Sequence, residues 1–257
     1  MLQKRIIPTL LLKDESLVKT IKYNKYQYIG DPCNTCRIFN ELEVDELCFL
    51  DIFASIEGRK PNFKILKDIA DECFMPLSYG GNVSNIQEAE QIYKTGFEKI
   101  VFNTATFTNQ ALIQEVSRIF GSQAVVIAVD VKKNFWGKTH VCCLHGTKDM
   151  GKSPQEWVKI VEDLGAGEIL LTSIDREGTW EGLDIDLIRS ITDITNLPVI
   201  AHGGAGNIGH IADAFNQGHA SAVALGSMVV FQKKGMGVLV NMPERKEIDK
   251  TINVNVE

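Results

Sequence analysis

The chain has 257 residues, of which 44% are hydrophobic and 23% are charged, an ordinary globular composition. A chain of this length buries most of its apolar surface without disulfides or metals. It contains 21 glycines and 7 prolines, too few for a disordered or collagen-like chain. The formal net charge of −6 argues against a general nucleic-acid-binding protein.

The apolar run nearest the N-terminus, residues 6–12, is too short to span a bilayer. Charged residues from Lys13 to Glu15 follow it directly, so it lacks the cleavage region of a signal peptide. We therefore expect a cytoplasmic protein without membrane association. The six cysteines are expected to be reduced in that compartment.

Cys33 and Cys36 have the CxxC spacing of zinc and redox sites. Asp31 and Pro32 predict a helix N-terminus at the same place, which puts both cysteines in its first turn. The following helix is expected to bury one face, made of Cys36, Ile38, Phe39 and Leu42. Because neither a second CxxC nor a histidine pair accompanies the motif, we expect no metal and no cofactor.

Short apolar runs recur along the chain, and most are followed by an amphipathic stretch. They lack polar alternation, which is typical of parallel strands covered on both faces. The predicted strands are residues 6–12, 47–52, 76–79, 99–103, 124–130, 168–172, 198–202 and 222–226.

Helix-termination and capping signals separate these strands. Ser84 with Gln87, and Ser153 with Glu156, are spaced as capping boxes. Thr108 precedes a further apolar stripe at helical spacing. Eight strands with helical crossovers in about 250 residues predict a single α/β domain over 1–257, a (β/α)8 TIM barrel. An open doubly wound sheet is the alternative, but GxGxxG does not follow the first strand.

The two halves of the chain resemble each other. Gly80-Gly81 follows the third predicted strand and Gly203-Gly204 follows the seventh. Hydroxyl-bearing turns follow the next strands, at Asn103-Thr104 and Gly226-Ser227. Glycine lets a backbone approach a phosphate closely, and helix N-termini supply N–H donors. This half-barrel repeat predicts two phosphate sites at one barrel mouth, and hence a bisphosphorylated ligand; simple tight turns are the alternative.

At these motifs the chain resembles HisF, the cyclase subunit of imidazole glycerol phosphate synthase, over nearly its whole length. The stretches that carry the resemblance include residues 4–7, 45–52, 103–105, 120–126, 165–176 and 203–206. The resemblance implies a (β/α)8 barrel without a glutaminase site of its own, which receives ammonia from a HisH-like glutaminase. It also implies ligand contacts by Lys19, Asp51, Thr172, Gly178 and Thr179. Lys19 is expected in a polar loop after the first strand.

In the HisF family two aspartates, at the ends of strands 1 and 5, act as general acid and base. Asp130 matches the second, but Leu11 stands at the first position. Leucine cannot transfer a proton, and losing one such group costs on the order of 10²–10⁴ in rate. His202, where a small residue is usual, and Glu177 in place of aspartate are further departures.

Charged residues stand at the starts of strands 1, 2, 4 and 6. Arg5, Glu46, Lys99 and Glu168 match the ring that closes the bottom of the HisF barrel. The resemblance implies an ammonia gate; a salt-bridged plug that only stabilises the barrel is the alternative. Residues of the same face that could contact the glutaminase are Asp45, Glu98 and Gln123.

A paralogous group resembles the chain more closely, the HisF-like proteins of acetamidino-sugar formation in surface-polysaccharide clusters. The stretches matched to it are residues 8–12, 17–20, 73–77 and 226–231. This resemblance implies a separate ATP-dependent sugar amidotransferase as a further partner. Two alternatives stay open: a genuine cyclase of histidine biosynthesis, and a barrel that senses a ligand and activates its glutaminase.

Overall fold

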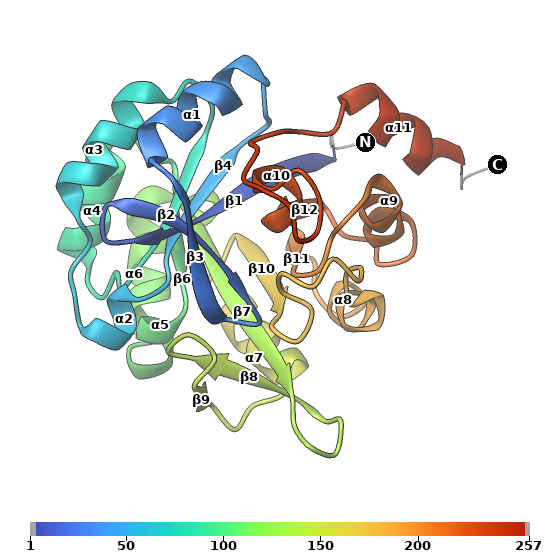
Figure 1. Ribbon diagram of the computed structural model, residues 1–257. Coiled ribbons are helices and arrows are strands. Elements are labelled where there is room, and N and C mark those ends of the chain that lie inside the picture. The colour runs from blue at the N-terminus through green and yellow to red at the C-terminus, as the bar shows by residue number, and fades with distance from the viewer. Residues whose placement is uncertain (1–3, 255–257) are drawn as a thin grey trace.

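In the computed structural model, which describes residues 4–254, eight parallel strands close into a barrel (Figure 1). Neighbours pair in the order β10, β11, β12, β1, β4, β5, β6 and β7, and β7 pairs with β10 to complete the ring. The (β/α)8 prediction is therefore confirmed. The barrel strands are β1 Arg5–Lys13, β4 Leu47–Asp51, β5 Leu77–Gly80, β6 Lys99–Phe102, β7 Val125–Lys133, β10 Glu168–Ser173, β11 Val199–His202 and β12 Ala222–Leu225.

Helices surround this barrel, as Figure 1 shows. The longer ones are α1 Pro32–Glu41, α3 Phe63–Glu72, α4 Ile86–Thr95, α6 Ala111–Phe120, α7 Pro154–Asp163, α8 Ile185–Thr192, α9 Ile208–Asn216 and α11 Arg245–Val254. Short helices follow some strands directly: α2 Ala54–Glu57, α5 Thr104–Thr108, the 3-10 turn η1 Ser122–Ala124 and α10 Ser227–Val230. We call the carboxyl ends of the barrel strands the top and their amino ends the bottom.

Two separate apolar clusters fill the molecule because strand side chains alternate between opposite faces. The larger cluster lies between barrel and helices and includes Leu10 and Phe39. The smaller cluster lies inside the barrel and includes Ile7, Ala128 and Leu170. On β1 the same alternation places Arg5 and Leu11, an even number of residues from Ile7, on the interior side.

Two predicted helix starts are confirmed by side-chain hydrogen bonds. Asp31 accepts from Asn34 N at 2.8 Å, and Ser153 accepts from Glu156 N at 3.2 Å. The prediction for Ser84 is wrong by one residue. Asn85 caps α4, and the carboxylate of Glu88 accepts from Ser84 N at 3.0 Å. Asparagine caps as well as serine does, so the sequence allowed both positions.

One other helix prediction needs correction. Ile38 and Leu42 of the first helical segment are 39% and 38% exposed, whereas Cys36 and Phe39 are fully buried, so the buried face of α1 is narrower than predicted. The predicted apolar stripe after Thr108 is confirmed as α6, and Thr104–Thr108 forms the separate short helix α5.

Four strands outside the barrel were not predicted. β2 Ser16–Ile21 pairs antiparallel with the end of β1, and β3 Asn24–Gly30 pairs with β2. β8 Thr139–Cys143 and β9 Lys148–Asp149 extend the end of β7 in the same way. The prediction of a polar loop around Lys19 is therefore wrong. Polar and aromatic residues dominate β3, because most of this strand is exposed to solvent and needs no apolar run.

Within residues 4–254, no helix is both long and apolar enough to cross a bilayer.

Trp157 tests the packing between barrel and helices, because it is fully buried on α7 and stacks on Phe107 with ring centroids 4.2 Å apart. We expect Trp157→Ala to lower the free energy of unfolding by about 3–5 kcal/mol through the cavity it leaves. Trp136→Ala is the matched control, since Trp136 is 86% exposed. Denaturant unfolding should show a loss within about 0.5 kcal/mol for that control; equal losses would contradict the packing described.

Candidate functional site

A pocket of about 680 Å³ opens at the top of the barrel, over β4, β5, β6 and β7. We call it the N-terminal pocket. It brings together predicted ligand residues from five separate segments: Asp51, Gly80, Gly81, Asn103, Thr104, Asp130 and Thr172.

Asp130, in the carboxyl-terminal half of β7, accepts a hydrogen bond at each of its carboxylate oxygens. Its Oδ1 accepts from the Tyr23 hydroxyl at 2.9 Å, and its Oδ2 accepts from Asn103 Nδ2 at 3.1 Å. Burial raises the pKa of Asp130 to about 6, and hydrogen bonds from Tyr23 and Thr172 act in the opposite direction. The carboxyl group can therefore exchange a proton near neutral pH, as a general acid or base must.

The β2–β3 hairpin forms the roof of the N-terminal pocket. Tyr23, at its turn, stacks on His145 with ring centroids 4.8 Å apart. Glu177, which follows β10, holds the hairpin down: it accepts from Tyr23 N at 3.2 Å through its side chain and from Lys22 N at 2.9 Å through its backbone carbonyl. Lys19 of β2 forms a buried ion pair with the same Glu177 carboxylate.

Asp51 and the glycine pair Gly80-Gly81 form one side of the pocket. Arg59 binds both carboxylate oxygens of Asp51, with nitrogen–oxygen distances of 3.0 and 3.2 Å. A Cβ at Gly81 would stand only 2.3 Å from the Tyr79 hydroxyl, so a side chain has no room there. The absence of a side chain at Gly81 therefore lets the backbone come close to the pocket, as a phosphate site requires.

The Thr104 hydroxyl accepts from Leu144 N at 3.2 Å.

A second, smaller pocket of about 250 Å³ lies over β11 and β12; we call it the C-terminal pocket. The predicted ligand residues that line it are Lys19, Gly178, Gly203, Gly204, Gly226 and Ser227. Glu177, His202 and two alanines, Ala205 and Ala224, complete the lining. Gly203 and Gly204 have φ angles of +96° and +109°, a backbone region that glycine adopts without strain.

Thr179 is the one predicted ligand residue that neither pocket lining includes. It is 7% exposed, and its hydroxyl donates to Arg176 O at 2.7 Å. It therefore shapes the turn after β10.

Leu11 lies near the top of β1 and is only 3% exposed. Its register partners are Leu50 on β4 and Val18 on β2. The first barrel strand therefore presents a buried apolar side chain near its carboxyl end.

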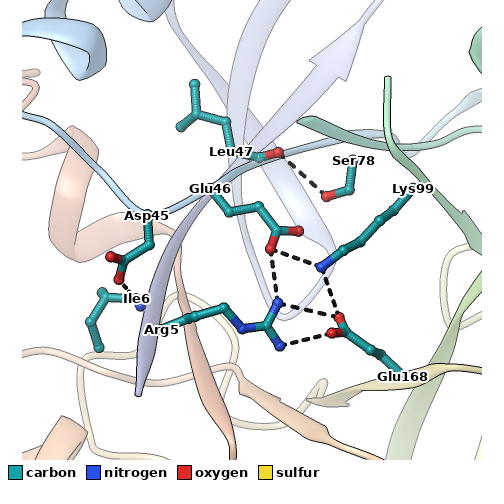
Figure 2. A network of polar contacts seen from close by, with 8 residues as sticks. All are labelled: Arg5, Ile6, Asp45, Glu46, Leu47, Ser78, Lys99 and Glu168. Atoms are coloured by element: carbon teal, nitrogen blue, oxygen red, sulfur yellow. Dashed lines mark hydrogen bonds and ion pairs between the residues drawn. The ribbon is translucent and has the colours of Figure 1, made fainter. Parts of the chain in front are cut away.

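A closed ring of charges lies at the bottom of the barrel, and Figure 2 shows its four members pointing toward one another. Arg5 contacts Glu46 and Glu168, each at 2.9 Å. Lys99 contacts the same two carboxylates at 3.0 and 3.2 Å. Each cation thus bridges both anions, so the four side chains satisfy one another across the barrel axis.

A small cavity lies inside the barrel directly above this ring. Glu46 borders it below, Thr9, Cys48 and Ser78 give it polar or weakly polar walls, and apolar strand residues complete it. The interior is therefore not fully packed between the charged ring and the top.

The predicted partner residues of the bottom face differ in their surroundings. Asp45 accepts from Ile6 N at 2.8 Å and pairs with Arg245 of α11 at 3.0 Å, so its carboxylate is already engaged within the chain. Glu98 and Gln123 are exposed. Gln123 Nε2 donates to Phe120 O at 3.2 Å.

Comparison with known proteins bears on this arrangement. A family model described as "Histidine biosynthesis protein" matches residues 5–234. Over 249 residues the chain is 46% identical to the "Putative imidazole glycerol phosphate synthase subunit hisF2" of Pseudomonas aeruginosa, covering 97% of this chain and 99% of that protein. The chain belongs to the HisF family.

The chain is also similar to proteins named HisF, without the number that the name hisF2 carries. The "Imidazole glycerol phosphate synthase subunit HisF" of Methanococcus maripaludis is 38% identical over 278 residues, covering all of this chain and 99% of that protein. The barrel is thus a HisF-like synthase subunit.

Within this HisF barrel, sequence reasoning missed Tyr23 and His145. Both line the N-terminal pocket, and both come from hairpin segments that were not predicted as strands. Neither residue stands in a recognisable motif. His202 was noted only as a departure from the HisF pattern, although it lines the C-terminal pocket.

Tyr23→Phe removes the hydroxyl that donates to Asp130. Because that hydrogen bond favours the ionised carboxylate, we expect the pKa of Asp130 to rise above its value of about 6. The carboxyl ¹³C signal, followed as a function of pH, measures this change. Tyr26→Phe is the control, because Tyr26 lies on the same hairpin with 53% exposure and should leave the titration unchanged. An unchanged pKa in Tyr23→Phe would contradict the contact.

Proposed function

We propose that this chain is the barrel subunit of a glutamine-dependent synthase of acetamidino-sugar formation. It pairs through its bottom face with a HisH-like glutaminase, passes ammonia through the barrel and binds a phosphorylated ligand at the top. The observation that carries the proposal is the buried Leu11 beside an otherwise equipped top face. A barrel that retains its pockets and charged ring but lacks one acid is suited to binding and delivery.

The charged ring and the cavity above it support ammonia passage. Arg5 and Lys99 each bridge Glu46 and Glu168, so when one side chain moves out toward solvent the other three charges each keep a partner. Such a ring can open without leaving a buried charge uncompensated, which would otherwise be costly. The interior cavity starts at Glu46, on the path that ammonia would follow to the top.

Exposed apolar side chains around the bottom support docking of a partner there. Three such side chains are Leu42, Phe74 and Ile119, with exposed fractions of 38%, 88% and 51%. Leu42 and Phe74 follow the ends of α1 and α3, and Ile119 lies in the last turn of α6; each of these helix ends leads into a barrel strand. Exposed apolar groups that gather on one face mark interaction sites. This face surrounds the charged ring, so a glutaminase bound there would release ammonia at the gate.

The amidination itself is assigned to a separate enzyme. Replacing an amide oxygen by nitrogen requires activation, which ATP supplies. Residues 146–153 have the spacing of a phosphate-binding P-loop. However, the N–H groups of Thr147, Met150 and Gly151 donate to Leu144 O, Val141 O and the Asp149 side chain, so they do not converge on a phosphate. An ATP-dependent sugar amidotransferase therefore completes the proposed system.

Two of the relatives have numbered names, the hisF2 protein of Pseudomonas aeruginosa and the hisF3 protein of Vibrio vulnificus. Such names fit a paralogue that works beside a histidine-pathway subunit. The second candidate function, the cyclase of imidazole glycerol phosphate synthase, is favoured by Asp130 and by both glycine pairs, which line the two pockets.

A cyclase assay separates these functions. The purified chain receives the bisphosphate substrate of imidazole glycerol phosphate synthase and excess ammonium at alkaline pH. We expect a rate on the order of 10²–10⁴ below that of the Methanococcus maripaludis HisF, because Leu11 cannot transfer a proton. Leu11→Asp should raise the rate, whereas Leu50→Asp, at the neighbouring register position, should not.

Normal turnover that Asp130→Asn abolishes would overturn the proposal and support the histidine-pathway cyclase. Tight substrate binding without turnover, together with faster glutamine hydrolysis and no ATP-dependent amidination of an acetamido sugar, would single out the ligand-sensing activator.

Phe74→Ser tests the bottom face. We expect it to weaken binding of the HisH-like glutaminase from the same genome about tenfold or more, since exposed aromatic side chains dominate interface energies. Phe135→Ser is the matched control, because Phe135 is 96% exposed but lies at the top, in the turn between β7 and β8. Calorimetric titration measures both; equal affinities for the two variants would place the interface elsewhere.

A further inference from the structure

His202 is a buried titratable residue that the proposed function does not use. It ends β11, is 6% exposed and lines the C-terminal pocket. A side chain of this size and polarity at a barrel mouth requires hydrogen-bond partners.

Its nearest partner is Thr172 on the adjacent strand β10. The two residues are in register, and His202 Nδ1 lies 3.1 Å from Thr172 Oγ1. Thr172 is also in register with Asp130 on β7, so the two side chains are neighbours on the same face of the sheet. The Thr172 hydroxyl is one of the groups that hold the pKa of Asp130 down. Three neighbouring strands thus align a carboxylate, a hydroxyl and an imidazole across the barrel mouth.

The Thr172 hydroxyl has one proton to donate. An ionised Asp130 only accepts, so a Thr172 hydroxyl that donates its proton toward this strand neighbour must accept from His202. This assignment makes Nδ1 the protonated nitrogen of His202 and leaves Nε2 as an acceptor. Among residues 4–254, no hydrogen-bond partner of Nε2 is found, and the C-terminal pocket borders the ring.

The surroundings keep the imidazole neutral. Burial lowers the pKa of His202 to about 4, the nearby Lys19 ammonium lowers it too, and Glu177 acts in the opposite direction. Lys19 comes from β2 and Glu177 follows β10, so both charges reach the ring from outside its own strand.

We propose that His202 is a ligand-contacting residue of the C-terminal pocket, and that Thr172 couples it to Asp130 in the N-terminal pocket. The Nε2 atom of His202 accepts a hydrogen bond from a ligand group that carries a proton, such as a hydroxyl, an amine or a singly protonated phosphate. The two pockets then share one hydrogen-bond chain. A proton gained by Asp130 reverses the chain, because Thr172 then donates to Nδ1 and Nε2 becomes the donor. The ligand group that the C-terminal pocket accepts therefore depends on the protonation of a residue in the other pocket.

Nitrogen-15 spectra of the histidine rings test the chain without ligand or glutaminase. At pH 8 we expect His202 to be neutral with its proton on Nδ1. Asp130→Asn, whose amide can donate to Thr172, should move that proton to Nε2. Asp51→Asn is the control, because it changes a carboxylate of the same pocket that Arg59 binds and should leave the tautomer unchanged. An Nε2-protonated ring in the unmodified chain, or an unchanged tautomer in Asp130→Asn, would refute the coupling.

Inorganic phosphate and sulfate at pH 7 test the ligand contact. The two anions have the same shape, but only phosphate carries a proton at this pH. We expect the His202 signals to shift on adding phosphate, and phosphate to bind about fivefold more tightly than sulfate, the effect of roughly one neutral hydrogen bond. His202→Ser should lose this preference while still binding both anions. Equal affinities in the unmodified chain, or ring signals that stay in place at saturating phosphate, would overturn the proposal. Neither experiment depends on the glutaminase, so its outcome is independent of the proposed function.

Discussion

Side chains on a barrel strand alternate between the interior and the helical layer, and closure of the sheet leaves that interior no other source of side chains. The interior of this protein is therefore composed strand by strand in three levels. Arg5, Glu46, Lys99 and Glu168 meet at the bottom, an apolar level with a small cavity follows, and polar groups gather at the top. A ring of paired charges, a small cavity and two top-face pockets thus follow one another from the bottom of the barrel to its top.

The same alternation explains why so much of the barrel could be predicted. Each strand is covered by helices on its outer face and by the barrel interior on its inner face, so it appears as an apolar run. Each of the eight predicted runs overlaps a barrel strand. Their ends then located Asp130 and both glycine pairs at the top. The β2–β3 hairpin gives no such signal, because contacts of its backbone with β1 and Glu177 hold it, and Tyr23 reaches Asp130 only through that placement.

Ion pairs within the chain determine the charge available at the top of the barrel as strongly as the replacement of a carboxylate by Leu11 does. Arg59 binds Asp51 and Lys19 binds Glu177, so the cation nearest each pocket already has an anion of its own. Leu11 removes a further carboxylate from the mouth, while Tyr23 and Thr172 add hydroxyl groups beside Asp130. The polar groups available to a ligand at the top are thus mainly hydroxyls beside Asp130, and unpaired charges contribute less.

The Asp45 carboxylate joins the two ends of the barrel's chain, because it receives both Ile6 N from the first strand and Arg245 from α11. Asp45 and Arg245, the two sides of this ion pair, are separated by 200 positions along the chain. Because α11 follows all eight barrel strands in the chain, this corner of the bottom face forms only after the last strand has been synthesised. A subunit that docks on this face would therefore meet a finished surface only once α11 has folded back against Asp45.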